Sequence, residues 1–335
     1  MTLYATLAAS RTWEKSIPDP EPPYQEHIFI GAGNTPIFGL QAIPEQPQGT
    51  IVGTYGITGD LQNQWFLRLL GRKAFGQNYA VALFDWRAHG KTAELSPTLT
   101  ADGLYEGEDF VRIAAQAKAM GCPAPFWFTG FSLGGQLALW AVKAAQAIAA
   151  WGPDLDLQAS DIGGGAVICP SLDSNRSLSY LVKHPLGKYL EKAIARNLKQ
   201  LAWKIHHCHP GAIDPLAIQR ANSIWGFDHE LVIGRLGFPS VEAYYQASSA
   251  LPLLPQLKQP TLILYATDDP MFDPTLAADL KAACIDNPAI DLVLTHHGGH
   301  VGYISSVFAQ QQAQDPDHWW AWNRVLEWCA RAGKG

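Results

Sequence analysis

Short apolar runs alternate with longer segments of helical composition over most of this chain, and this alternation restricts the possible fold more than any other feature. Two of the runs, AVICP at residues 166–170 and TLILYA at residues 261–266, are almost continuously apolar. Such runs are typical of strands covered on both faces. Strands that alternate with helices build a mostly parallel sheet with helices on both sides. The sequence therefore predicts an α/β fold.

The boundaries of these elements follow from turn-forming residues and from the length of each run. The predicted strands span Gln25–Gly31, Pro36–Ile43, Thr50–Tyr55, Tyr79–Asp85, Phe126–Gly130, Gly165–Cys169, Thr261–Ala266 and Ile290–Thr295. The predicted helices span Leu61–Phe75, Leu104–Met120, Leu133–Trp151, Leu276–Ala283 and Asp317–Arg331.

One long interval, residues 171–259, interrupts the alternation. It is rich in helix-forming residues, aromatic residues and histidine, and it contains no clear strand. Because it lies between two strands of the predicted sheet, we interpret it as a helical cap insertion. Residues 25–170 and 260–335 then form the α/β core, and the Pro-rich stretch at 17–24 predicts an extended N-terminal segment over residues 1–24.

Composition excludes several classes of protein. The chain has 335 residues, of which 47% are hydrophobic, so it can bury a large core and is not a disordered protein. Its net charge is −6 and only 16% of its residues are charged. A nucleic-acid-binding protein needs clustered Lys and Arg to neutralise phosphates, so we expect no nucleic-acid partner.

The cysteines and the N-terminus bear on location. The five cysteines are scattered and contain no CxxC pair, which favours reduced thiols in the cytoplasm over a disulfide framework. The first residues lack a basic and then apolar signal sequence. No stretch approaches about 18 consecutive apolar residues, so no integral membrane segment is expected. Peripheral contact with a membrane remains possible in this interpretation.

The sharpest local signal is the sequence Gly130-Phe131-Ser132-Leu133-Gly134, a GxSxG motif between a predicted strand and a predicted helix. A turn this tight holds the serine in a strained backbone conformation, and only small residues are tolerated two positions to either side. The turn would expose the Ser132 hydroxyl above the sheet, with the backbone N–H of Leu133 beside it at a helix N-terminus. Ser132 is therefore the predicted nucleophile.

A serine nucleophile needs a histidine base and a carboxylate that orients it, and this fold places them in the order Ser, acid, His. The acid should follow a late strand, where Asp268 and Asp269 stand. We favour Asp269, because the following Pro-Met-Phe can turn the loop inward. Of the three histidines after the last strand, we favour His300, which lies in a flexible Gly-Gly-His-Val-Gly setting, over His296 and His297.

An oxyanion hole needs a second backbone N–H donor. The loop after the third strand, residues 54–60, carries Gly56 and Gly59, and Ile57 is the candidate donor beside Leu133. Aromatic residues near the site and in the cap insertion are the candidates for the substrate pocket: Tyr55, Phe131, Trp203, Trp225 and Tyr303.

Other clusters indicate structural roles. Asp85 and Arg87 follow the fourth strand, and we expect them to form a buried pair that holds their loop. Residues 206–209 read His-His-Cys-His, but adjacent residues of a helix point in different directions and no second ligand pair stands at zinc spacing. No GxGxxG or P-loop sequence is present, so neither a metal nor a cofactor is expected.

Several segments resemble those of the YheT-like family of α/β-hydrolases. They are GITGD at 56–60, FDWRAHGKT at 84–92, GFSLGG at 130–135, the long segment from FDHELV to TDDPMFDP at 227–274, and HHGGHVGY at 296–303. The resemblance covers roughly residues 25–332. It implies a Ser132–Asp269–His300 triad and carboxylic-ester hydrolysis, with some relatives acting on lipids and some transferring acyl groups to alcohols. Relatives usually carry His-Gly where this chain has Tyr55-Gly56.

The sequence thus supports three functions in order. The first is a cofactor-free serine esterase that cleaves small-molecule or lipid esters of moderately hydrophobic acyl groups. The second is an acyltransferase that passes the acyl group from the enzyme to an alcohol or lipid hydroxyl. The third is a catalytically silent hydrolase fold that serves as a binding protein, which a missing triad member would indicate.

Overall fold

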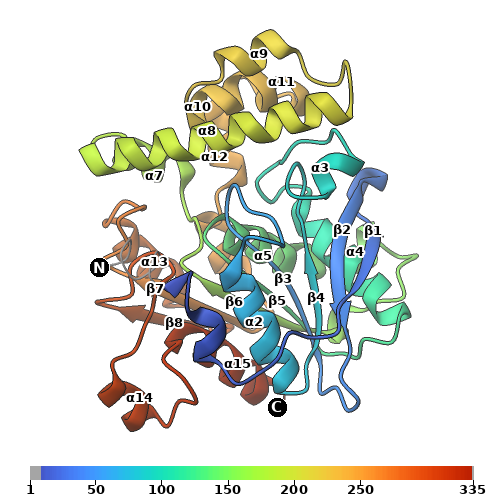
Figure 1. Ribbon diagram of the computed structural model, residues 1–335, viewed down its shortest axis with the longest axis vertical. Helices are drawn as coiled ribbons and strands as arrows, with labels where there is room; N and C mark the ends of the chain where they lie inside the picture. Colours follow the sequence, from blue (N-terminus) through green and yellow to red (C-terminus); the bar gives the residue numbers. More distant parts are fainter. Residues whose placement is uncertain (1–8, 334–335) are drawn as a thin grey trace.

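The central element of the computed structural model, which describes residues 9–333, is an eight-stranded sheet in the order β1-β2-β4-β3-β5-β6-β7-β8 (Figure 1). The strands are β1 (Gln25–Ile30), β2 (Pro36–Ala42), β3 (Thr50–Thr54), β4 (Ala80–Phe84), β5 (Phe126–Phe131), β6 (Ile162–Ile168), β7 (Thr261–Ala266) and β8 (Ile290–Thr295). β2 pairs antiparallel with β1 and with β4, and all other pairs are parallel. The predicted mostly parallel sheet is confirmed.

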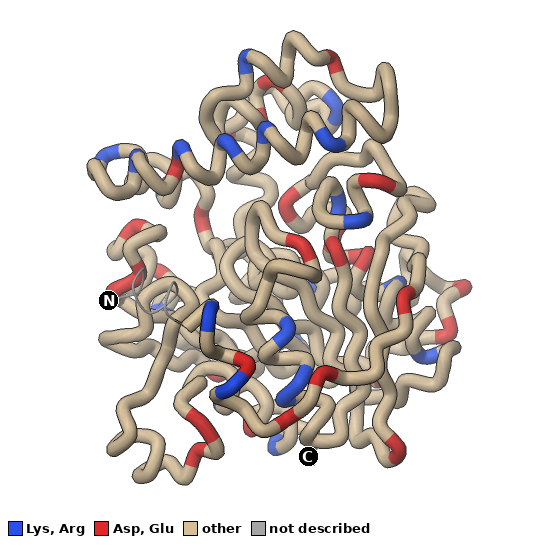
Figure 2. The backbone as a smooth tube through the Cα atoms, in the orientation of Figure 1, with Lys and Arg blue, Asp and Glu red and all other residues tan. Residues whose placement is uncertain are grey.

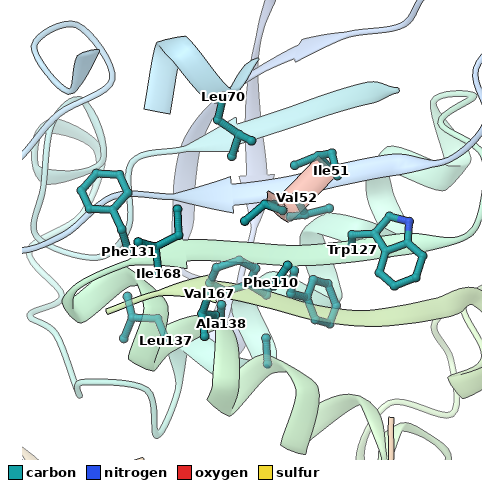
Figure 3. Close-up of a cluster of buried hydrophobic side chains, with 14 of the residues drawn as sticks. Ile51, Val52, Leu70, Phe110, Trp127, Phe131, Leu137, Ala138, Val167 and Ile168 are labelled. Carbon is teal, nitrogen blue, oxygen red and sulfur yellow. The ribbon is translucent and has the colours of Figure 1, made fainter. Parts of the chain in front are cut away.

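Helices cover both faces of this sheet. They are α2 (Trp65–Gly76), α3 (Thr92–Leu95), α4 (Glu106–Ala119), α5 (Leu133–Ala145), α6 (Ile148–Trp151), α13 (Leu276–Cys284), α14 (Val307–Ala313) and α15 (Trp320–Ala332). α2 packs with α15, where the rings of Phe66 and Trp322 stack 5.8 Å apart. Leu70 of α2 lies on one side of the strands and Leu137 of α5 on the other (Figure 3). The central strands β3, β4 and β5 are buried along their whole length, as their apolar sequences require.

Between β6 and β7 the described chain contains helices and turns only. We call these the inserted helices: α7 (Ser174–Leu181), α8 (Pro185–Cys208), α9 (Pro215–Arg220), α10 (Ile224–Phe227), the π-helix η4 (Asp228–Val232), α11 (Ile233–Leu236) and α12 (Val241–Ser248). Their starts follow from local sequence: side chains of Asp173, Ser223 and Ser240 accept backbone N–H groups of the first turns of α7, α10 and α12. Most of these helices lie together above the sheet in Figure 1.

A separate hydrophobic cluster holds the inserted helices together. Leu198, Ala202 and Ile205 of α8 pack there with Ile218 and with Tyr244 of α12. The cluster also includes Ala88, Ala93 and Leu99 from loops at the edge of the sheet. The inserted helices therefore rest on the sheet domain through apolar contacts.

Three predicted segments differ from the structure. The helix predicted over 133–151 is divided, because the backbone at Ala147 (φ −112°, ψ 16°) leaves the helical region between α5 and α6. α2 begins at Trp65 and not at Leu61, because the Asp60 carboxylate accepts the N–H groups of Gln62 and Asn63 and forms a turn there. The short helix α14 was not predicted.

The N-terminal segment, predicted to be extended over 1–24, is only partly so. Residues 1–8 lie outside the described residues. Trp13–Ser16 form the 3-10 helix η1, because Trp13 is buried and its ring stacks on Trp65 at 6.1 Å. Residues 17–24 have no regular secondary structure.

Candidate active site

Ser132 lies on the sharp turn between β5 and α5, with φ 56° and ψ −128°. A non-glycine residue pays in strain for a positive φ, and such residues cluster at functional sites. The flanking glycines are required by space: a Cβ at Gly130 would lie 2.3 Å from the carbonyl oxygen of Gly134, and a Cβ at Gly134 would lie 2.3 Å from that of Tyr55. The turn can therefore form only because both positions lack a side chain.

The structure brings Ser132, His300 and Asp269 into one hydrogen-bonded row. The Nδ1–H of His300 donates to Oδ2 of Asp269 (2.7 Å), and its Nε2 accepts the hydroxyl hydrogen of Ser132 (2.8 Å). Oδ1 of Asp269 accepts the backbone N–H of Met271 (2.8 Å), and its side chain is buried. The ring of Phe272 packs edge-on against that of His300, 5.0 Å away. The imidazole is thus held in one tautomer and one orientation.

The neighbouring candidates lie outside this row. Asp268 accepts the backbone N–H of Gly299 (2.8 Å) and so shapes the loop that carries His300. His297 is exposed, with Nδ1 3.5 Å from a carboxylate oxygen of Asp268. His296 is also exposed.

The loop after β3 passes directly beside the candidate nucleophile. A Cβ at Gly56 would lie 3.1 Å from Cβ and 3.4 Å from Oγ of Ser132. Ile57 and Leu133 both line the cavity that contains Ser132. Among the hydrogen bonds of residues 9–333, none uses the backbone N–H of either residue. These two donors are therefore free to bind an oxygen of a substrate.

Two buried side chains hold this loop in place. The Tyr55 hydroxyl donates to Asp85 (2.6 Å), which also accepts the backbone N–H of Leu61 (2.9 Å). Nε2 of His89 accepts the backbone N–H of Thr58 (3.1 Å), while its Nδ1–H donates to the carbonyl of Arg87 (2.8 Å). Burial lowers the pKa of His89 to about 4, so the ring is neutral near pH 7 and can accept this bond.

Asp85 serves this loop and not Arg87, which corrects the predicted Asp85–Arg87 pair. Burial raises the pKa of Asp85 to about 6, although hydrogen bonds from Tyr55, Lys91 and Leu61 oppose the rise. Arg87 pairs instead with Asp109 on α4, with nitrogen–oxygen distances of 2.7 and 2.8 Å. The tight turn at residues 86–89, with φ 64° at Ala88, directs the Arg87 side chain away from Asp85.

The cavity beside Ser132 is walled on one side by the inserted helices. Apolar side chains of α7 and α8 form this wall: Leu178, Leu181, Ile194, Leu198, Leu201 and Ile205. The four residues of α8 recur at intervals of four, three and four, which is the period of one helix face. That spacing was the sequence signal for this wall. Trp86, Met271 and Phe272 complete it from loops at the sheet edge.

The five aromatic residues predicted to line the pocket do not line this cavity. Tyr55 is buried on Asp85, and Phe131 packs against Phe66 on the other side of the sheet. Trp203 packs edge-on to His206, and Trp225 is 41% exposed with its indole N–H on Glu242. Tyr303 is buried, and its hydroxyl lies 3.1 Å from Sγ of Cys169. Residue type led to these predictions, whereas side-chain direction decides which residues face a cavity.

Two further features concern what the site could hold. In the part of the chain that the structure describes, no three His, Cys, Asp or Glu side chains gather in a group that could bind a metal ion. Over the same residues, no helix combines the length and the apolar character needed to cross a bilayer.

The sheet, the elbow at Ser132 and the loop beside it define the α/β class of hydrolases. The model of the alpha/beta hydrolase family matches residues 57–313, and the chain belongs to this family. It is 55% identical to "Putative esterase slr0264" of Synechocystis sp., over 98% of this chain and 90% of that protein. It is 29% identical to "Putative esterase YheT" of Escherichia coli over 61% of this chain, and it spans 55% of that protein.

A solved structure shows the same fold. The esterase Pf2001 of Pyrococcus furiosus superposes with a TM-score of 0.54 at 16% identity, over 93% of this chain and 90% of that chain. The predicted fold class and the resemblance to YheT-like hydrolases are thereby confirmed.

Proposed function

We propose that this protein is a serine hydrolase that cleaves carboxylic esters, with Ser132 as nucleophile, His300 as base and Asp269 as the orienting acid. The observation that carries the proposal is the continuous row of hydrogen bonds from Asp269 through His300 to Ser132. A serine hydroxyl becomes a useful nucleophile when an adjacent base takes its proton. Membership of the family and similarity to proteins named as esterases support the ester as the bond that is cleaved.

The reaction follows from the positions of these groups. Oγ of Ser132 attacks the ester carbonyl carbon while its proton moves to Nε2 of His300, and Asp269 stabilises the imidazolium that forms. The proton then passes to the departing alkoxide oxygen, which leaves as an alcohol. In the second half, His300 takes a proton from water, the hydroxide oxygen attacks the acyl-enzyme, and the acid and free Ser132 are released.

The charge that develops on the carbonyl oxygen needs donors placed in advance. The backbone N–H groups of Leu133 and Ile57 meet this need, because both face the cavity at Ser132 and neither has another partner among the described residues. Loss of one such donor typically costs about 3–4 kcal/mol of transition-state stabilisation. The loop that carries Ile57 should therefore matter for activity nearly as much as the three side chains.

Replacement of Ser132 tests the proposal. Ser132→Ala should abolish turnover of p-nitrophenyl esters, lowering kcat by a factor on the order of 10⁵–10⁶, and it should abolish covalent labelling by a fluorophosphonate probe. Ser171→Ala is the matched control, because this second serine lines the same cavity and should leave labelling intact. Labelling of the Ser132→Ala protein would reject the assignment. Absence of labelling and turnover in the unmodified protein would favour the binding-protein alternative.

The aliphatic wall formed by α7 and α8 supports an uncharged, moderately hydrophobic acyl group. A series of p-nitrophenyl esters from acetate to palmitate should show the highest kcat/KM at an intermediate chain length. A maximum at acetate with no turnover of longer chains would contradict this preference. Added ethanol in the same assay tests acyl transfer: ethyl ester formed faster than free acid would make transfer the main reaction.

A further inference from the structure

The turn between α7 and α8 and the first turns of α8 expose large apolar side chains. Val182, Leu186 and Tyr189 are 39%, 51% and 71% exposed. This end of α8 projects beyond the other inserted helices (Figure 1). Apolar side chains grouped on a projecting edge are typical of surfaces that meet another apolar phase.

Basic side chains accompany these apolar residues. Lys188, Lys192 and Arg196 stand four residues apart and so lie along one line of α8, and all three are exposed. None of them forms an ion pair or side-chain hydrogen bond with any residue in the range 9–333. Their charge is therefore available to an external partner.

The charge of α8 is opposite to that of the whole chain. The helix contains five basic residues and one acidic residue, Glu191, whereas the chain carries −6. Glu191 is buried and accepts the backbone N–H of Ile224, so it does not offset the exposed cations. Figure 2 shows the blue segments that follow α8 along the projecting edge.

The opposite side of the same two helices belongs to the cavity. Leu178 and Leu181 of α7, with Ile194 and Leu198 of α8, line the space that contains Ser132. An apolar surface that bound outside these helices would thus lie one helix thickness, about 10 Å, from the cavity.

We propose that this edge, residues 182–196, binds the surface of a membrane that contains anionic lipids. Lys188, Lys192 and Arg196 contact the lipid headgroups, and Leu186 and Tyr189 enter the interfacial region. A helix with basic residues on one side and exposed apolar residues beside them lies in a membrane interface and does not span it. Charge complementarity and the exposed apolar group together select an anionic lipid surface over an acidic protein. This proposal concerns binding alone and does not depend on ester hydrolysis.

Sedimentation of the full chain with vesicles tests the proposal. The protein should sediment with vesicles of phosphatidylcholine and phosphatidylglycerol, and it should stay in solution with phosphatidylcholine alone. Binding should weaken between about 0.05 and about 0.5 M salt, because screening shortens the reach of the charges. A protein that stays in solution with the mixed vesicles at low salt, or that sediments equally with both kinds, would overturn the proposal.

Charge removal locates the surface. Each lysine near an anionic membrane strengthens partition by about fivefold, so K188Q/K192Q/R196Q should weaken it roughly a hundredfold. The matched control K15Q/K258Q/R331Q removes the same charge from exposed positions outside this edge and should bind as the unmodified protein does. Equal losses in the two variants would show that only net charge matters, and would refute the assignment to α8.

A second variant tests the apolar part. L186S/Y189S should reduce the fraction of binding that persists at high salt, with the low-salt response to phosphatidylglycerol retained. Circular dichroism and thermal unfolding establish that each variant is folded. Capture by immobilised polyglutamate, without sedimentation on the mixed vesicles, would assign this edge to an acidic protein and contradict the proposal.

Discussion

Tyr55 explains how this chain tolerates a departure from the His-Gly pair usual in the family that it resembles. Its ring is fully buried, and its hydroxyl donates to Asp85, which also accepts the backbone N–H groups of Leu61 and Lys91. The side chain at this position therefore anchors the start of the loop, while the candidate oxyanion donor is the backbone N–H two residues later. A backbone donor can survive the change of side chain if the loop is held in another way.

Removal of one hydroxyl tests this anchor. Tyr55→Phe leaves Asp85 with two donors in place of three at a buried site, and loss of such a bond costs about 1–3 kcal/mol. We expect kcat for a soluble p-nitrophenyl ester to fall about tenfold with little change in KM, and the free energy of unfolding in urea to fall by that amount. Tyr24→Phe is the control, because the buried Tyr24 hydroxyl has no hydrogen-bond partner among the described residues. Equal effects of the two substitutions would disprove the anchoring role.

Helix α5 owes its position to close backbone contacts at its first turn. The carbonyl of Tyr55 lies against Gly134, and the backbone of Pro170 lies against Gly135, where a Cβ would be 3.1 Å from the Pro170 Cα. The first N–H groups of a helix have no partner within it. Placing α5 this close to the loop after β3 aims those groups at the space in front of Ser132.

A single methyl group at this contact should displace the helix from the loop. Gly134→Ala places a Cβ 2.3 Å from a backbone oxygen that cannot rotate away, so α5 or the loop must shift. We expect kcat/KM to fall by a factor of about 10²–10³, as for loss of an oxyanion donor, and stability to fall by about 1–3 kcal/mol. Gly234→Ala on α11 is the control, since nothing lies within 4 Å of its Cβ position. Near-normal activity of Gly134→Ala would refute this account of the elbow.

At the scale of the whole molecule, the inserted helices are bound to the sheet domain by polar as well as apolar contacts. Gln136 and Trp140 of α5 both donate to the carbonyl of Ser248 in α12 (3.0 and 2.7 Å). Asp102 from the sheet domain and Asp228 from η4 are buried and line the same cavity. Burial raises the pKa of Asp102 to about 7, and the pKa of Asp228 lies well above its ordinary value for the same reason.

This pair should make the protein less stable in alkaline solution. A carboxyl with pKa near 4 in the unfolded chain and about 7 in the fold keeps a proton only in the folded state between those values. The free energy of unfolding contributed by this group therefore falls as pH rises from about 4 to about 7. Asp102→Asn should remove this fall and raise stability at pH 8 by about 1–3 kcal/mol.

Urea unfolding at pH 5 and pH 8 measures the effect. Asp286→Asn, at an exposed position, is the control and should follow the unmodified protein at both values. A loss of stability in Asp102→Asn at pH 8 would mean that the carboxylate is stabilised in the fold by groups that oppose its burial.

The amino-acid sequence alone determined the order of strands and helices, the place of the elbow and the choice of Ser132, Asp269 and His300, which the structure brings within hydrogen-bond distance of one another. These features depend on local signals: apolar runs, glycine spacing, and the loops that follow strands. A parallel sheet carries such loops to one edge, so chain order alone brings distant residues together.

Only the tertiary structure decided which side chains face the cavity and which charges pair. Arg87 meets Asp109 on α4, and α8 turns one apolar face toward Ser132 while its cations face outward. Each of these contacts depends on how one element is rotated and placed against another. Rotation and placement come from packing between segments far apart in the chain, which no local pattern of residues encodes.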